Sequence, residues 1–235
     1  MINNLKIKAP FFEIGPKSYL FGDDILDLAK FADEMSEKYG VDIIFTTPFL
    51  SISEVKAATS HIHVFAPHMD PILPGRGLTD ILPEAVLAAG AEGVMLNHCE
   101  RPLSLSVLNA TVKRAGELGL ATIVCADSLA EASAVAQLAP DIIVAEPSEL
   151  VGTGVSVGPE YVKAATDSVK NVNDGILVLT AAGISNGDDV YNTIIAGADA
   201  TGTSSGIAKL KTRSERNAMA EEMISAVRRA WDKRH

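Results

Sequence analysis

Short apolar runs alternate with amphipathic segments along the whole chain, and this alternation limits the possible folds more than any other feature. Apolar β-branched runs of this length are typical of strands that are buried on both faces of a sheet. The longer segments between them carry apolar residues at helical spacing. The predicted strands occupy residues 11–14, 41–46, 63–66, 93–96, 121–125, 141–145, 175–179 and 198–202. The predicted helices occupy residues 23–39, 52–58, 81–89, 104–118, 129–138, 159–171, 187–196 and 213–233.

Eight strand–helix pairs in 235 residues predict an α/β protein that forms a single (β/α)8 barrel. Barrels of this kind use roughly 200 to 250 residues and eight parallel strands. An open nucleotide-binding sheet would use fewer strands and would carry a G-x-G-x-x-G turn after one of them, which this sequence lacks. We therefore expect residues 1–235 to form one barrel domain.

The composition excludes several classes of partner. A net charge of −10 disfavours binding to nucleic acid or to an anionic membrane surface. An anionic substrate would then require a pocket that is locally positive. The two cysteines, Cys99 and Cys125, have no C-x-x-C spacing, and no apolar run reaches the roughly 18 residues that cross a bilayer. We expect a reduced, cytoplasmic protein without a membrane partner.

The residues that follow the predicted strands carry the chemistry, because the active sites of such barrels lie at the carboxyl ends of the strands. A lysine, a histidine and a glutamate in these loops supply an ammonium, an imidazole and a carboxylate base, which is what proton transfer next to a carbonyl requires. Glycine-rich turns after the last two strands offer free N–H groups to a phosphate. These candidates are Lys17, His98, Glu100, Glu146, Gly183, Ser205 and Gly206.

The stretch that begins at Glu146 combines a catalytic candidate with a predicted lid. Glu146 stands at the end of a buried strand, and Pro147 restricts its backbone to extended conformations. A short segment follows and ends at Gly152 and Gly154, which supply the torsions of a hinge. The sequence therefore predicts an oriented carboxylate beside a loop that closes over a bound substrate.

Several motifs in the correct order resemble the triosephosphate isomerase superfamily, in its short archaeal-type branch. Residues 97–100, Asn-His-Cys-Glu, resemble the Asn-His-Ser-Glu signature of that family. Residues 145–154, Ala-Glu-Pro-Ser-Glu-Leu-Val-Gly-Thr-Gly, resemble its Glu-Pro-Pro-Glu-Leu-Ile-Gly-Thr-Gly lid. Segments 64–71, 81–84 and 182–185 are similar as well. The resemblance implies a TIM barrel and a cofactor-free aldose–ketose isomerase that acts on a small phosphorylated sugar.

The resemblance also implies a role for each candidate. Glu146 would be the base that moves a proton between adjacent carbons, and His98 the neutral group that polarises the carbonyl. Lys17 would hold the negative charge of the substrate, and Glu100 would orient the cluster. The phosphate would rest on N–H groups of four residues, Gly152, Gly183, Ser205 and Gly206. The default reaction is the interconversion of glyceraldehyde 3-phosphate and dihydroxyacetone phosphate through an enediolate.

Four departures from the family pattern lie at the substrate end of the site. Gly15 stands where the family has an asparagine, so one side-chain donor is missing from the pocket. Pro67 replaces a glutamine, and Ala181 replaces a glycine beside the phosphate loop. The loop 74–80 lacks the Thr-Gly pair with which the family reaches a neighbouring subunit. The sequence therefore leaves open the geometry of the homo-oligomer that the resemblance implies.

Other functions remain open from the sequence. A tetrulose-phosphate (erythrulose phosphate) isomerase would explain the altered asparagine position through a larger substrate. A catalytically silent phosphate-binding barrel would explain the lost donor, and a phosphate-binding synthase or epimerase would share the last two loops. His61, His63 and His68 hint at metal spacing, but no neighbouring carboxylate or cysteine in the sequence completes a site, so we expect no metal.

Overall fold

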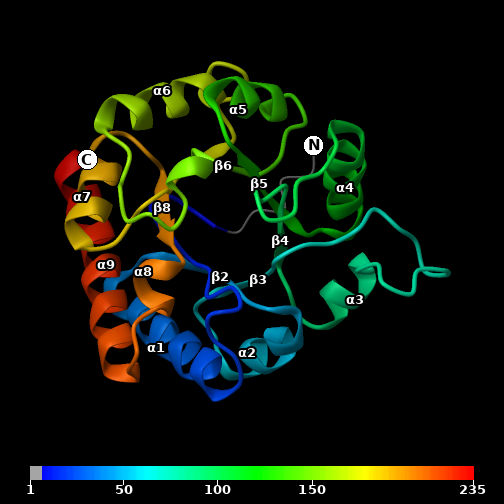
Figure 1. Ribbon diagram of the computed structural model, residues 1–235, viewed down its shortest axis with the longest axis horizontal. Coiled ribbons are helices and arrows are strands. Elements are labelled where there is room, and N and C mark those ends of the chain that lie inside the picture. Colours follow the sequence, from blue (N-terminus) through cyan, green and yellow to red (C-terminus); the bar gives the residue numbers. More distant parts are fainter. Residues whose placement is uncertain (1–6) are drawn as a thin grey trace.

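The computed structural model describes residues 7–235 and contains a closed ring of eight parallel strands in the order of the chain. The first strand, β1, pairs with β2 on one side and with β8 on the other, which closes the ring. Figure 1 looks along the barrel and shows helices outside the strands. The predicted (β/α)8 TIM barrel is thus confirmed. Its strands are β1 (Phe11–Ile14), β2 (Asp42–Thr46), β3 (His63–Ala66), β4 (Gly93–Leu96), β5 (Ala121–Ala126), β6 (Ile142–Ala145), β7 (Leu177–Thr180) and β8 (Ala200–Thr203).

The helices follow the strands as the sequence pattern indicated, with one short addition after β8. Capping side chains fix several helix starts: Ser104, Ser128, Asn186 and Thr212 each accept a hydrogen bond from a backbone N–H of the first turn. The helices are α1 (Asp23–Tyr39), α2 (Ile52–Ala58), α3 (Pro83–Ala88), α4 (Leu105–Leu118), α5 (Leu129–Ala136), α6 (Pro159–Lys170), α7 (Gly187–Ile195), α8 (Ser205–Ala208) and α9 (Arg213–Arg234).

Two differences from the sequence prediction have identifiable reasons. The strand predicted at 175–179 begins only at Leu177, because Asn173 holds the preceding residues in a turn. The side-chain oxygen of Asn173 accepts the N–H of Gly175, and its backbone carbonyl accepts the N–H of Ile176. The helix α8 was not predicted, because four residues are too few to show helical periodicity.

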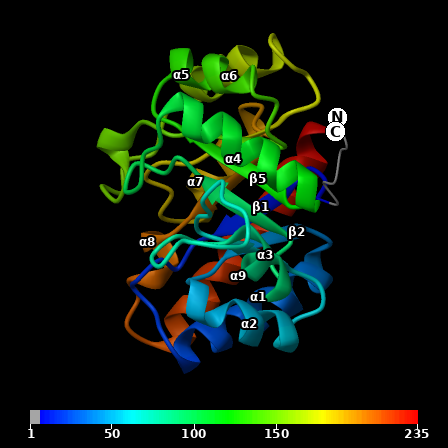
Figure 2. The same cartoon turned by 90° about the vertical axis from the view of Figure 1, so that its right-hand side faces the viewer.

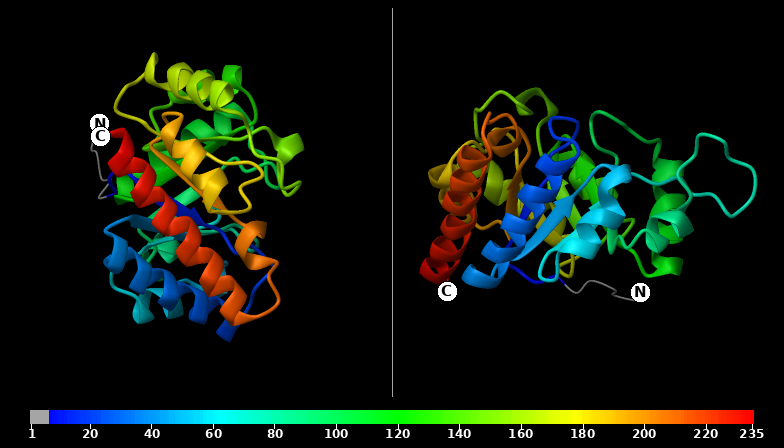
Figure 3. Two further views of the ribbon diagram at one scale, coloured as in Figure 1. Left: turned by 90° about the vertical axis from the view of Figure 1, so that its left-hand side faces the viewer. Right: turned by 90° about the horizontal axis from the view of Figure 1, so that it is seen from below.

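The barrel has two apolar regions. The interior of the ring is filled by side chains from alternate positions of several strands, among them Phe11, Ile44, Phe65, Ile123, Val144 and Leu179. A larger layer lies between the strands and the surrounding helices. The last helix, α9, packs against α1 and α7 and completes this outer layer (Figure 3). Within residues 7–235, no helix combines the length and hydropathy needed to span a membrane.

The segment between β3 and α3 projects from the rest of the barrel in Figure 1 and in the right panel of Figure 3, and it points towards the viewer in Figure 2. It carries two exposed apolar side chains, Leu73 and Leu78. The carboxylate of Asp70 anchors its base, because it accepts the N–H of Ile81 at 2.7 Å. This segment contains the loop 74–80 that departs from the family pattern.

We predict opposite effects on stability for alanine at two glycines. At Gly93, at the start of β4, an added Cβ would overlap the ring of Phe65 and lie 2.7 Å from the carbonyl oxygen of Ala121. Gly93→Ala should therefore lower the free energy of unfolding by about 1 to 3 kcal/mol. At Gly116, inside the exposed face of α4, an added Cβ would contact nothing within 4 Å. Gly116→Ala should raise the free energy of unfolding by about 0.5 to 1 kcal/mol.

Urea unfolding followed by circular dichroism measures both changes. An unchanged midpoint for Gly93→Ala would contradict the close packing of β4 against Phe65.

Candidate active site

A cavity of about 800 Å³ opens at the carboxyl ends of the strands. Loops after β1, β4, β6, β7 and β8 all contribute to its wall. The whole chain carries a net charge of −10. The wall of the cavity, in contrast, contains three carboxylates and three cations: Glu13, Glu100, Glu146, Lys17, Arg101 and Lys209. The charges of the lining therefore balance, so the cavity is less negative than the chain as a whole and offers cations to an anionic ligand.

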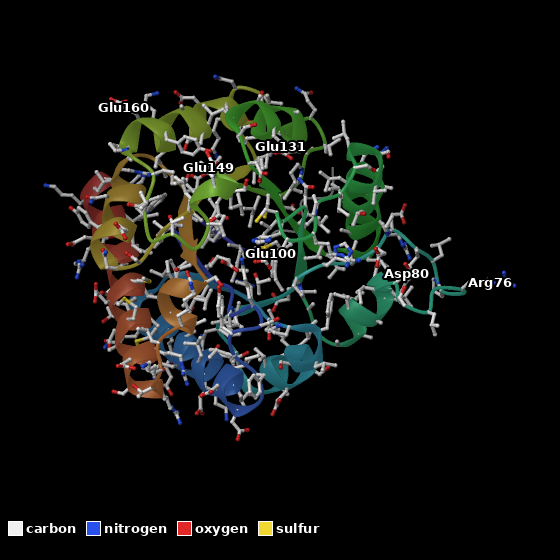
Figure 4. All side chains as sticks on the ribbon, in the orientation of Figure 1. Arg76, Asp80, Glu100, Glu131, Glu149 and Glu160 are labelled. Carbon is white, nitrogen blue, oxygen red and sulfur yellow. The ribbon has the colours of Figure 1, made fainter. Side chains whose placement is uncertain are left out.

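Lys17 and Glu100 form an ion pair at the mouth of the cavity. The Nζ atom of Lys17 lies 3.0 Å from Oε1 of Glu100, which comes from the loop after β4. Glu100 is mostly exposed, and Figure 4 shows it over the centre of the ring of strands. Lys17 is only 26% exposed and has a left-handed φ of 49°. Such backbone conformations are strained in non-glycine residues and cluster at functional sites.

Asn97 fixes the loop that carries His98, a role that the sequence prediction missed. Its side-chain amide donates hydrogen bonds to the carbonyl oxygen of Cys125 at 3.0 Å and to Oε1 of Glu131 at 3.1 Å. Its oxygen accepts the N–H of Leu103 at 2.9 Å. Asn97 also has a left-handed φ of 59°. These three bonds hold the turn that directs the next side chain into the cavity.

The hydrogen bonds of His98 define its tautomer. The backbone N–H of Glu100 donates to Nδ1 of His98 at 3.1 Å, so this nitrogen acts as an acceptor. Burial lowers the pKa of His98, and the neighbouring charge of Lys17 lowers it further. A neutral ring with an occupied Nδ1 carries its proton on Nε2. His98 is therefore a neutral hydrogen-bond donor.

Glu146 lies in the cavity wall directly after β6. Its N–H donates to the carbonyl oxygen of Ala126 at 3.0 Å, which extends the strand ladder to the catalytic candidate. Burial raises the pKa of the Glu146 carboxyl, while the charge of Lys17 and the N–H of Ala182 act in the opposite direction. A carboxylate with a raised pKa is a stronger base than an exposed one.

The four residues predicted to bind phosphate all line the same cavity: Gly152, Gly183, Ser205 and Gly206. Gly183 packs so closely that an added Cβ would overlap the carbonyl of Val155 and approach the backbone nitrogen of Ser156 to 2.7 Å. The end of the predicted lid therefore rests on the loop after β7. Within the lid, Gly152 and Gly154 have φ values of 74° and 76°. The short turn Ser148–Leu150 lies between Glu146 and these glycines, and Figure 4 labels Glu149 on this turn.

Glu13 is a cavity residue that the sequence prediction did not select. It lies in the middle of β1, is 8% exposed, and lines the cavity beside Gly15. Burial raises its pKa to about 7; Thr46 lowers the pKa, the charge of Glu146 raises it and that of Lys17 lowers it. The sequence did contain a signal for this residue, because Glu13 is the charged residue in an otherwise apolar strand of four residues.

The histidines that suggested metal spacing do not converge. His63 pairs with a carboxylate, since its Nδ1 lies 2.8 Å from Oε2 of Glu92. His68 contacts Asp70 instead. Among residues 7–235, no group of three or more His, Cys, Asp or Glu side chains has the arrangement of a metal site.

Comparison with known proteins agrees with the motifs in the sequence. The family profile described as "Triosephosphate isomerase" matches residues 21–227. A triosephosphate isomerase of Saccharolobus solfataricus is 36% identical over 229 residues, which cover 95% of this chain and 99% of that protein. A triosephosphate isomerase of Methanobacterium bryantii is 38% identical over 211 residues, covering 88% and 92% respectively. One from Methanocaldococcus jannaschii is 37% identical over 197 residues, covering 83% and 90%. With this similarity along the barrel, the chain belongs to the triosephosphate isomerase family and is an isomerase.

Proposed function

We propose that this protein interconverts glyceraldehyde 3-phosphate and dihydroxyacetone phosphate without a cofactor. The observation that carries the proposal is the convergence of Glu146, His98 and Lys17 on one cavity. Glu146 and His98 lie within the residues that match the family profile. The match to two of the triosephosphate isomerases named above covers 99% and 92% of their lengths. The reaction moves one proton between adjacent carbons, and these groups supply a base, a neutral donor and a fixed cation.

Each group has a distinct role in the proposal. The Glu146 carboxylate removes the proton next to the carbonyl and returns it to the adjacent carbon. The Nε2–H of His98 donates to the carbonyl oxygen, and it stabilises the charge that develops on this oxygen in the enediolate. Lys17 adds a positive charge close to that oxygen. Glu100 is a positioning residue, because its carboxylate holds Lys17 and its N–H fixes the tautomer of His98.

The phosphate group is assigned to backbone N–H groups of Gly152, Gly183, Ser205 and Gly206. Ser205 and Gly206 lie at the start of α8, on the wall of the cavity. Movement of the segment 147–154 about its two glycines would close the cavity over the substrate. Closure would exclude water and strengthen each electrostatic interaction inside.

We predict that Glu146→Gln lowers kcat by on the order of 1,000-fold, because the amide cannot accept the proton. In the wild type, kcat/KM should fall as the pH drops through the pKa of Glu146, since the base is lost when it is protonated. This limb should lie above pH 4.5, because burial raises that pKa. A coupled assay across pH measures both effects. The control is Glu160→Gln on the exposed start of α6, and a Glu146→Gln variant as active as this control would contradict the assignment.

A comparison of two substrates tests the missing donor at Gly15. Turnover on glyceraldehyde 3-phosphate that is at least equal to turnover on L-erythrulose 1-phosphate supports the triose reaction. Turnover on the four-carbon sugar that is higher by on the order of 100-fold would assign a tetrulose-phosphate isomerase, matching a lost oxyanion donor. Wild-type turnover no higher than that of Glu146→Gln on either sugar would assign a silent barrel.

We further propose that two or more copies of the chain associate through the projecting segment between β3 and α3. Leu73 and Leu78 are exposed on it, and exposed apolar side chains on a projecting loop are suited to insertion into a second copy. The double variant Leu73→Glu and Leu78→Glu should sediment as a monomer at concentrations where the wild type does not. Leu50→Glu, at another exposed leucine, is the control. A monomeric wild type would contradict this proposal.

A further inference from the structure

Glu13 places a carboxyl group under the reacting end of the cavity. Its side chain extends from β1 towards Gly15, where an added Cβ would lie only 3.0 Å from Oε1 of Glu13. On the other side, Oε2 would lie 3.1 Å from an added Cβ at Gly202 in β8. The carboxyl group therefore occupies the volume into which a side chain at position 15 would extend.

The Oε1 atom of Glu13 is buried and has no hydrogen-bond partner among the described residues. Leaving a buried polar atom unpaired costs about 1 to 3 kcal/mol, so a carboxyl group with a purely structural role is normally satisfied. Asp141, which is also buried in part, shows the usual arrangement. Its Oδ2 accepts both the N–H and the hydroxyl of Thr122, at 2.8 and 3.0 Å. Glu13, whose Oε1 has no such partner, lines the wall of the cavity.

The surroundings of Glu13 keep much of it protonated near neutral pH. Burial raises its pKa to about 7, and the charge of Glu146 raises it further, while the nearby Thr46 hydroxyl and the charge of Lys17 favour the ionised form. The Thr46 hydroxyl is itself buried without a hydrogen-bond partner among the described residues, so it leaves Oε1 of Glu13 free. Cys125 from β5 also lies near this carboxyl, and its thiol has a pKa raised by burial. A protonated carboxyl group carries one O–H donor, whereas a carboxylate only accepts. Glu146 can therefore be ionised as a base while Glu13 donates.

We infer that Glu13 is a substrate-contacting residue, which donates a hydrogen bond from its carboxyl O–H to an oxygen at the reacting end of the substrate, below Gly15. The inference rests on the proposed isomerase function and adds a residue to it. No covalent bond forms or breaks in this contact. The donor acts on the oxygen whose charge grows as the enediolate forms, and it fills the place that Gly15 leaves without a side chain.

Three variants test the donor. Glu13→Leu removes the carboxyl while filling its volume, and it should lower kcat by on the order of 100-fold with a smaller change in KM. Glu13→Gln keeps an N–H donor and should stay within about 10-fold of the wild type. In the wild type, kcat/KM should also fall above pH 7, as Glu13 ionises and loses its donor, and Glu13→Gln should lack this alkaline limb. Equal kcat values for the Gln, Leu and wild-type forms would overturn the inference.

A rescue experiment tests the location. The double variant Glu13→Ala with Gly15→Asn should turn over at least 10-fold faster than Glu13→Ala alone, because an amide at position 15 can enter the vacated volume. Gly15 does not have a left-handed φ, so its backbone accepts a side chain.

Circular dichroism shows which variants are folded. Failure of a folded double variant to recover would overturn the inference. If the wild type turns over triose phosphate and Glu13→Leu does so equally well, the role of Glu13 is overturned while the proposed function stands. An inactive wild type would overturn both.

Discussion

The closed hydrogen-bonded ring of strands is the constraint on which the rest of the structure depends. Each strand pairs in parallel with the next, and β1 also pairs with β8, so all eight strands run in one direction and their carboxyl ends meet at one rim. Residues separated by more than a hundred positions, such as Lys17 and Glu146, thereby line one cavity. The strained backbone at Lys17, Asn97 and Ala182 lies at this same rim. Well-packed strands below it can offset the cost of such conformations.

Burial then gives similar side chains different chemical behaviour. It raises the pKa values of Glu13 and Glu146 and lowers that of His98, so the cavity brings together a base, a group that can be neutral and a neutral imidazole. A nearby carboxylate disfavours the ionisation of a second carboxyl group. In the proposed mechanism, burial and, to a smaller extent, the charge of Glu146 favour a neutral Glu13, while Lys17 adds a positive charge to the site.

The sequence predicted the fold well because hydrophobic periodicity determines which segments are buried. The strands β1, β3 and β4 and the helices α1 and α2 match their predicted ranges, and the loops after the strands brought Lys17, His98, Glu100 and Glu146 together in the cavity as expected. The sequence could not predict contacts that depend on three-dimensional packing. Gly15 indicated a lost donor, but only the coordinates show that the carboxyl of Glu13 occupies the same volume. Similarly, two of the three hydrogen bonds of Asn97 depend on β5 and α5 lying beside its loop.

In the proposed mechanism, a carboxylate base in the cavity transfers the proton and can exchange it with solvent. The most direct measurement is the conversion of dihydroxyacetone phosphate in D₂O, with the product trapped by oxidation and analysed by mass spectrometry or NMR. An enediolate formed by Glu146 can exchange the transferred proton, so we expect deuterium on carbon 2 of the trapped product. Product that carries only the original hydrogen would show that the transferred hydrogen does not exchange with solvent and would contradict this mechanism.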